Sequence, residues 1–492
     1  MFATRRSISH VSVSHGRLSH VSGLFRTTLN VRRRSFGVSR GGIPGRLLHP
    51  RKHQDASTHS HPRLLFSTIS FNDPIEYEFI DGVEPLALYE PGGYHPVMVD
   101  DLLHRRYRIV DKLGHGGYST IWLAHDEQTT RYVALKVAIS GQMLPRREPS
   151  ILRALSESVP STQETTLGVF DASTTIPQVL EVFNVRGPNG IHVCYTKTLA
   201  QGNLKEASFN RLFPIEVARL LAARLALAVS LIHSQGFVHG GSHQQLTSCP
   251  SQTSEKHLAS LKRCPSIGPM GSHFRPMLRL RRSCPLYLGR MAEEFTLDDA
   301  NGLILGDFGE AFAPATEERL GGDCNTPVAM RAPEALFEPD TPVSFSADIW
   351  SLGTAIWEIL GMNFIFSETE TMDEIVAQQI DVLGYQGLPL AWREHWERPN
   401  TEELVTETEV EVPRHPTGDR HSWPSLEQAF EEFVQKHRRE QAVMGVFGDE
   451  ETEAILDLMR GMLKFKPEER ITIQEVLQSE WMTKWALPRL ER

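Results

Sequence analysis

Two short segments of the chain combine residues suited to binding a polyphosphate and a metal ion. Residues 114–117 (GHGG) lie between two apolar runs, and glycines in such a turn let backbone N–H groups approach phosphate oxygens where larger side chains would clash. Lys136 follows in a third apolar run and can place a positive charge on the same phosphates. Residues 306–309 (GDFG) offer the carboxylate of Asp307, a ligand type that Mg²⁺ prefers. These residues predict a site for a phosphorylated nucleotide and a metal ion.

The elements that must position the first segment are three antiparallel strands. One apolar run ends at Leu113, a second spans residues 121–124, and a third spans residues 132–137 with Lys136 inside it. The runs and the glycines between them predict strands with a tight first turn. A lone glycine pattern usually marks an ordinary hairpin, so a nucleotide site requires further motifs later in the chain.

The order strand, Gly-x-Gly-x-x-Ser-x-Ile, strand, Ala-Leu-Lys resembles the ATP-binding lobe of protein kinases. After Asp307, the runs 330–334 (MRAPE), 348–353 (DIWSLG) and 467–471 (PEERI) occur in the order found in that family. Among protein kinases, the chain resembles the SR-protein-specific kinases of fungi. This closer resemblance rests on three runs: 91–97 (PGGYHPV), 119–123 (STIWL) and 239–240 (HG).

This resemblance covers about residues 84–482 apart from one window, and it implies an α+β, bilobal protein-kinase fold. We expect a kinase domain at 107–482, with a small antiparallel β-sheet in the N-lobe (107–200) and a mainly α-helical C-lobe (201–482). The implied function is ATP- and Mg²⁺-dependent phosphorylation of serine or threonine in basic, Arg-Ser-rich proteins, with a role in mRNA splicing. The residues expected to bind the nucleotide are Leu113, Gly114, His115, Gly116, Gly117, Tyr118, Ser119, Thr120, Ile121, Ala134 and Lys136.

Three residues carry the catalytic roles that the resemblance implies. Lys136 would hold the phosphates, Glu148 would hold Lys136 from a helix, and Asp307 would bind Mg²⁺. Pro149 restricts the second role, because proline is tolerated only in the first turn of a helix. Either the helix begins at Glu148, or the partner of Lys136 is another acid, with Glu157 next along the chain.

Further residues would support this site. Glu334 and Arg470 are expected to form a buried ion pair, and Asp348 is expected to cap the backbone of the catalytic loop. Residues 191–199 (IHVCYTKTL) resemble the last N-lobe strand running into the hinge that would bind the adenine edge. Residues 217–232 are predicted to form a buried helix entered through Pro214, since Arg219 and Arg224 interrupt them and they are too short for a membrane span.

The window at residues 241–284 departs from the family pattern. A kinase needs an aspartate to deprotonate the substrate hydroxyl and, shortly after it, an asparagine for a second Mg²⁺; here these positions hold Gly241 and Leu246. The window also has three of the five cysteines, one acidic residue, and no helical or strand period. Three interpretations stay open: a frame-shifted or mis-spliced translation, a pseudokinase or nucleotide-binding scaffold for a basic partner, or a base supplied from elsewhere, such as His243.

The N-terminal 70 residues differ in charge from the rest of the chain. They hold twelve Lys and Arg residues and one acid, which leaves about −21 on the remaining residues of a chain with a net charge of −10. Such an Arg- and Ser-rich segment is typical of a disordered basic tail or of a mitochondrial transit peptide. The corresponding locations are the nucleus or cytoplasm, or the mitochondrion. Residues 71–106 are expected to form a linker that docks on the N-lobe.

An acidic body favours a basic protein as the partner and disfavours direct binding of nucleic acid. The run at 402–411 (EELVTETEVE) is one candidate acidic surface, although such runs are usually solvated faces. We expect a monomer without a membrane span. The five cysteines have no spacing that indicates a disulfide framework or a zinc site.

Overall fold

The computed structural model describes residues 84–141, 147–158, 163–165, 168–170, 174–200, 202–241, 246–248, 291–398, 412–418 and 420–490, which all lie in one compact unit. Several predictions concern residues outside these ranges: the 1–70 extension, the first part of the 71–106 linker, most of the 241–284 window with His243, and the acidic run at 402–411.

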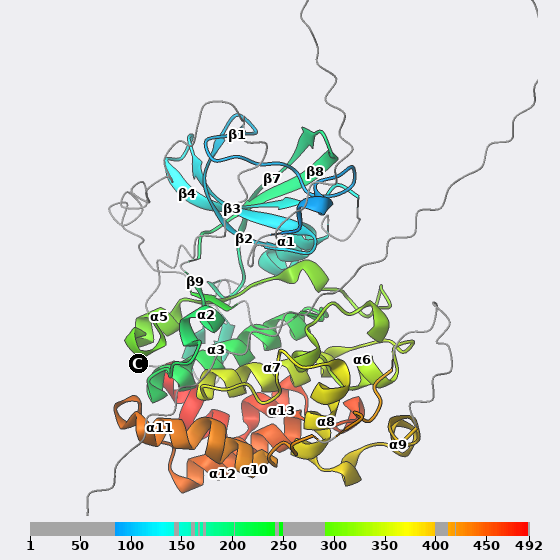
Figure 1. The fold of residues 1–492 in the computed structure, drawn as a ribbon. Helices are drawn as coiled ribbons and strands as arrows, with labels where there is room; N and C mark the ends of the chain where they lie inside the picture. Colours follow the sequence, from blue (N-terminus) through cyan, green and yellow to red (C-terminus); the bar gives the residue numbers. More distant parts are fainter. Residues whose placement is uncertain are drawn as a thin grey trace, which may run out of the picture. The chain divides into compact units, whose positions relative to one another are not determined.

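An antiparallel sheet of six strands forms the N-lobe, in the order β1-β2-β3-β4-β8-β7 (Figure 1). Its strands are β1 (Leu102–Leu103), β2 (Tyr107–Gly116), β3 (Ser119–Asp126), β4 (Arg131–Ala138), β7 (Val179–Gly187) and β8 (Gly190–Lys197). One face of the sheet carries an apolar core that includes Trp122, Leu135 and Cys194. The three strands predicted around the glycine-rich turn are thus confirmed as β2, β3 and β4, and a short turn joins the first two.

Residues that precede the predicted lobe are part of its core. Val97 and Leu103 pack with the apolar residues of the sheet, and β1 pairs with β2. The buried side chains of Glu84 and Lys112 form an ion pair. The sheet therefore begins inside the segment treated as a linker, because a strand of two residues is too short to show an alternating pattern.

The N-lobe also contains a helix, α1 (Glu148–Ser158), and a short hairpin of β5 (Gln163–Thr165) and β6 (Gly168–Phe170). The rest of the chain is mainly helical (Figure 1). Its α-helices are α2 (Leu204–Ser208), α3 (Ile215–Ser234), α5 (Leu297–Asn301), α6 (Glu334–Phe337), α7 (Phe345–Leu360), α8 (Met372–Leu383), α9 (Leu390–Trp396), α10 (Leu426–Phe430), α11 (Lys436–Glu440), α12 (Asp449–Met462) and α13 (Ile473–Gln478).

Helix α3 is the centre of the C-lobe core, and it confirms the predicted buried helix. Pro214 stands at its N-cap position, and the helix is buried along most of its length. Arg219 is buried as well, and it is compensated by Glu451, whose Oε1 accepts a hydrogen bond from Arg219 Nε at 2.8 Å. A buried charge with such a partner is tolerated in a core that would reject an unpaired one.

A small antiparallel sheet joins residues from three parts of the chain. Its strands are β9 (Gly202–Asn203), β10 (Leu246–Ser248) and β11 (Leu303–Leu305), with β10 in the middle. Strand β10 lies inside the 241–284 window, although the sequence of that window shows no helical or strand period. A three-residue strand is held by backbone hydrogen bonds to its two neighbours, so it leaves no periodic signal in its own sequence.

Among the residues that the structure describes, no helix is both long enough and apolar enough to cross a membrane.

Candidate active site

The glycine-rich turn is a hairpin in which Gly116 pairs with Ser119 and residues 117–118 form the connection. A Cβ atom added at Gly114, Gly116 or Gly117 would meet no atom of the described chain within 4 Å. These three glycines also lack the positive φ that would require glycine. Neither packing nor backbone conformation therefore explains why glycine stands at these three positions. Their lack of side chains is instead what a ligand lying close to this backbone would require.

The register of the sheet places several predicted site residues in one row. Ile121 lies opposite Lys136 on β4, and Lys136 lies opposite Tyr195 on β8. Residues directly opposite one another on neighbouring strands project from the same face of a sheet. In the next row of the same face, Ala134 lies opposite Lys197. This face is the one opposite the N-lobe core, and its Tyr195 is buried in a second core together with Leu152 and Leu155 of helix α1.

Thr120 lies on the other face of β3. Its hydroxyl accepts a hydrogen bond from Trp122 Nε1 at 2.9 Å, and both side chains are buried. Of the predicted nucleotide-binding residues, Thr120 can therefore contribute only its backbone.

The three residues expected to be catalytic come together from three separate elements. Lys136 Nζ on β4 lies 2.5 Å from Glu148 Oε2 on α1 and 3.8 Å from Asp307 Oδ1, which follows β11. The ion pair expected between Lys136 and Glu148 is thus present. Glu157, the alternative partner, is exposed near the end of α1.

The start of helix α1 explains how Pro149 is accommodated. Because the helix begins at Glu148, Pro149 is its second residue, where the missing N–H has no intrahelical partner to lose. Glu148 is buried, with a relative exposure of 2%, so its carboxylate faces inward from the first turn.

The electrostatics of the cluster favour its charged form. Burial alone would raise the pKa of Glu148, but Lys136 and then Lys197 hold it below its ordinary value. Burial likewise opposes the charge on Lys136, yet Glu148 and Asp307 raise the pKa of this lysine above its usual range. A lysine held charged between two carboxylates is suited to bind phosphate oxygens.

Asp307 adopts a left-handed backbone conformation with φ 59° and ψ 66°. This conformation is uncommon for residues other than glycine, and such residues are frequent at functional sites. No group of three or more His, Cys, Asp or Glu side chains in the described residues could hold a metal ion by itself. Asp307 nevertheless fits Mg²⁺, because nucleotide-bound Mg²⁺ takes one or two protein carboxylates and completes its shell with phosphates and water.

Asp348 holds the backbone of residues 239–240, in the segment expected to be the catalytic loop. Its Oδ2 accepts a hydrogen bond from His239 N at 2.7 Å, and its Oδ1 accepts one from Gly240 N at 3.0 Å. His239 Nε2 lies 2.9 Å from Gly306 O, so this nitrogen carries the proton, and Nδ1 can accept from Gly241 N at 3.3 Å. The scaffold of a catalytic loop is therefore in place, but Gly241 carries no side chain to act as a base.

The ion pair expected between Glu334, the first residue of α6, and Arg470 is present. Arg470 Nη1 and Nη2 lie 2.7 and 2.5 Å from the two carboxylate oxygens of Glu334, and the Arg470 side chain is 0% exposed. The same guanidinium donates to three backbone carbonyls, those of Ser346, Lys464 and Phe465.

Two features of the site were missed at the level of sequence. Tyr94, in the turn before the sheet, donates a hydrogen bond from Oη to Gly116 O at 2.8 Å and so fixes the glycine-rich hairpin. Lys197 and Tyr195 stand on the face that carries Lys136. Lys197 could have been singled out from the sequence, because it lies inside the apolar run 191–199 and an unpaired lysine is rarely found in a buried strand.

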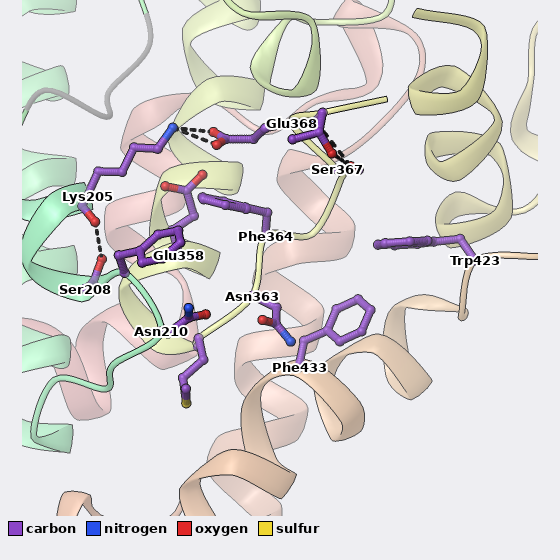
Figure 2. Close-up of a pocket in the computed structure, with 14 residues that line it drawn as sticks. Lys205, Ser208, Asn210, Glu358, Asn363, Phe364, Ser367, Glu368, Trp423 and Phe433 are labelled. Carbon is purple, nitrogen blue, oxygen red and sulfur yellow. Dashed lines mark hydrogen bonds and ion pairs between the residues drawn. The ribbon is translucent and has the colours of Figure 1, made fainter. Parts of the chain in front are cut away.

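A separate pocket of about 350 Å³ lies in the C-lobe, between α2, the end of α7 and the segment after α7 (Figure 2). Lys205 Nζ forms an ion pair with Glu368 at 2.6 Å and lies 5.2 Å from the centre of the Phe364 ring. Glu358 projects into the same pocket, where no described residue forms a hydrogen bond or ion pair with it (Figure 2). Burial, and then the charge of Glu368, raise the pKa of Glu358 well above its ordinary value.

Comparisons with known proteins agree with this geometry. Residues 293–482 match the protein kinase domain family, in a region that begins after the 241–284 window. A serine/threonine protein kinase of Aspergillus fumigatus is 25% identical over 419 residues, which are 81% of this chain and 90% of that protein.

Two relatives are more similar over shorter stretches. The protein kinase dsk1 of Schizosaccharomyces pombe is 32% identical over 219 residues, 40% of this chain and 39% of dsk1. The human SRSF protein kinase 3 is 39% identical over 109 residues, 22% of this chain and 18% of that kinase. The chain thus has the bilobal fold of the protein kinase superfamily, and within that superfamily it resembles the SR-protein-specific serine/threonine kinases.

Proposed function

We propose that this chain is an ATP- and Mg²⁺-dependent serine/threonine protein kinase that acts slowly on basic, Arg-Ser-rich proteins. The observation that carries the proposal is the cluster in which Lys136 meets Glu148 at 2.5 Å and Asp307 at 3.8 Å. These side chains come from β4, from α1 and from the segment after β11. Neither packing nor backbone conformation accounts for the glycines in the hairpin between β2 and β3.

Each part of the site has a task in this proposal. ATP supplies the phosphoryl group, and Mg²⁺ neutralises charge on its phosphates. Lys136 binds phosphate oxygens, Glu148 keeps Lys136 extended, and Asp307 binds the metal ion. Because a positioned general base usually contributes about 10²–10⁴-fold, Gly241 leaves a site that relies on positioning and charge alone.

The preference for a basic substrate rests on the C-lobe pocket and on the names of the SR-kinase relatives. The pocket holds two carboxyl groups, those of Glu358 and Glu368, and one amine, that of Lys205, with aromatic rings beside them (Figure 2). An entering arginine guanidinium could pair with Glu358 and stack on Phe364. The acidic surface expected at 402–411 lies outside the described residues, so it remains a prediction.

Replacing Lys136 by alanine should lower phosphate incorporation into an Arg-Ser peptide by about 10²-fold, because a preorganised charge on the transferred group is lost. Incorporation of labelled phosphate from ATP would be compared in wild type and variant. Lys484→Ala is the matched control, since this lysine is half-exposed on the surface and should leave incorporation unchanged.

The second candidate function is a nucleotide-binding scaffold without phosphotransfer, favoured by glycine at 241 and leucine at 246. The same assay separates the two. If wild type binds ATP but gives no incorporation above that of Lys136→Ala, the enzyme proposal is wrong and the scaffold is supported.

Glu358→Gln should weaken binding of an Arg-rich peptide by about tenfold, because one ionic contact in a partly desolvated pocket is lost. In wild type the raised pKa of Glu358 means that the carboxyl must release a proton before it can pair with arginine. Peptide affinity should therefore rise as the pH is raised through the titration of Glu358, and this rise should be smaller in the variant. Fluorescence anisotropy of a labelled peptide measures both effects.

The control for this experiment is Glu427→Gln, which changes an exposed carboxylate outside the pocket. Equal loss of affinity in the two variants would show that only overall charge matters and would remove the pocket from the proposal.

A further inference from the structure

Lys197 is the last residue of β8, and it stands at the entrance to the segment expected to bind the adenine edge. It lies opposite Ala134, two residues along β4 from Lys136. Its side chain therefore projects from the same face as Lys136, about 7 Å further along the strand direction. In contrast to the ammonium group of Lys136, the side-chain amine of Lys197 forms no hydrogen bond or ion pair with any residue that the structure describes.

The charge of Lys197 acts on the catalytic cluster. Among the groups that lower the pKa of Glu148, Lys197 comes directly after Lys136. Burial lowers the pKa of Lys197 itself, while the carboxylates of Glu148 and Asp307 oppose that effect. The amine is thus within the field of both carboxylates, although neither holds it in an ion pair.

With both lysines protonated, two positive charges face two negative charges in this site. Lys136 and Lys197 balance Glu148 and Asp307, while the neighbouring Glu310 is neutralised by Arg319, at 2.7 Å. A cluster with Lys136 alone would carry a net negative charge and would repel a polyphosphate until metal ions compensated it. A neutral cluster with an unpaired ammonium group needs less compensation.

We propose that Lys197 is a second binding cation for the nucleotide phosphates, so that this site binds a nucleoside triphosphate with little dependence on Mg²⁺. The inference rests on the nucleotide site of the proposed function but does not require phosphotransfer. It also fits Leu246, which removes the usual ligand of a second Mg²⁺, because the lysine supplies positive charge that the missing ion would otherwise bring.

The test is calorimetric titration of ATP into the full chain, once with Mg²⁺ and once with EDTA. Wild type should bind with dissociation constants within about threefold of each other. Lys197→Met, which keeps the length and removes the charge, should lose about tenfold in EDTA and less with Mg²⁺. Lys197→Arg keeps the charge and should behave as wild type.

Two results would overturn the inference and leave the proposed kinase function standing. One is wild type that binds ATP only with Mg²⁺, and the other is a Lys197→Met variant whose affinity in EDTA equals that of wild type. Mg²⁺-independent binding without any phosphate incorporation would support the inference and contradict the kinase function. Absence of ATP binding under both conditions would overturn both. Thermal unfolding without nucleotide checks the fold, and Lys197→Gln serves if the methionine variant unfolds at lower temperature.

Discussion

Replacing Gly241 by aspartate is expected to raise the rate of phosphate transfer to an Arg-Ser peptide by about 10²–10⁴-fold, the usual contribution of a positioned general base. The backbone at this position is already fixed, because Asp348 binds the N–H groups of His239 and Gly240, and Thr326 Oγ1 donates to Gly240 O at 2.9 Å. The new carboxylate would start beside Asp307, where the metal-bound phosphates are proposed to lie.

Space for the side chain is limited but adequate. A Cβ at position 241 would lie 3.1 Å from His239 Cε1 and 3.4 Å from Asp307 O, so neighbours must shift by a few tenths of an ångström. Gly241 does not have the positive φ that would strain a side chain. Gly240 does, with φ 67°, and a Cβ there would meet Glu310 O at 2.8 Å. Aspartate is therefore expected to be accommodated and to raise the rate at position 241, but not at position 240.

Initial rates of phosphate incorporation would be measured for wild type, Gly241→Asp and Gly241→Asn. Asparagine has the same shape as aspartate and cannot accept the proton, so it should stay close to wild type. Equal rates for the aspartate and asparagine variants would show that a carboxylate at position 241 does not act as the general base. Adding Leu246→Asn to Gly241→Asp should raise the rate further, through a second metal ligand.

Replacing Arg470 by methionine is expected to lower the free energy of unfolding by about 3–5 kcal/mol, as is typical when one partner of a buried ion pair is removed. Glu334 would be left buried at 5% exposure without its bidentate partner, and three backbone carbonyls would lose a donor. Urea-induced unfolding of wild type and variant measures the difference.

The control is the double variant Glu334→Met/Arg470→Met. Because it removes both charges, it should be more stable than Arg470→Met alone, even though it differs from wild type at one more position. A double variant less stable than the single one would mean that the backbone contacts of Arg470, and not the buried charge of Glu334, cause the loss.

The parts of the fold that sequence predicted are those with a local signal. The strands β2 to β4 show apolar runs separated by glycines, and α3 is a long apolar segment entered through proline. Strands β1 and β10 were missed because two or three residues cannot display a period, and their pairing depends on neighbours distant in the chain.

The same division applies to the site. The roles of Lys136, Glu148 and Asp307 came from a family resemblance, and the structure adds that the three side chains meet. Helix α1 begins at Glu148, and this start explains why Pro149 is tolerated. The sequence could not predict it, because the ends of helices are the least certain part of any prediction from pattern. The roles of Lys197 and Glu358 depend on register and burial, which no local pattern reports.

The order of residues along the chain specifies the chemical groups that are present: a lysine and a carboxylate for phosphates and metal, and a glycine where a base would stand. Which of these groups share one electrostatic environment depends on how the chain folds. The reason is physical, since charge interactions fall with distance in space and strengthen with burial, and neither quantity is a property of position along the chain. Lys136 and Lys197 are far apart in sequence, yet the pairing of β4 with β8 places both on one face beside Glu148.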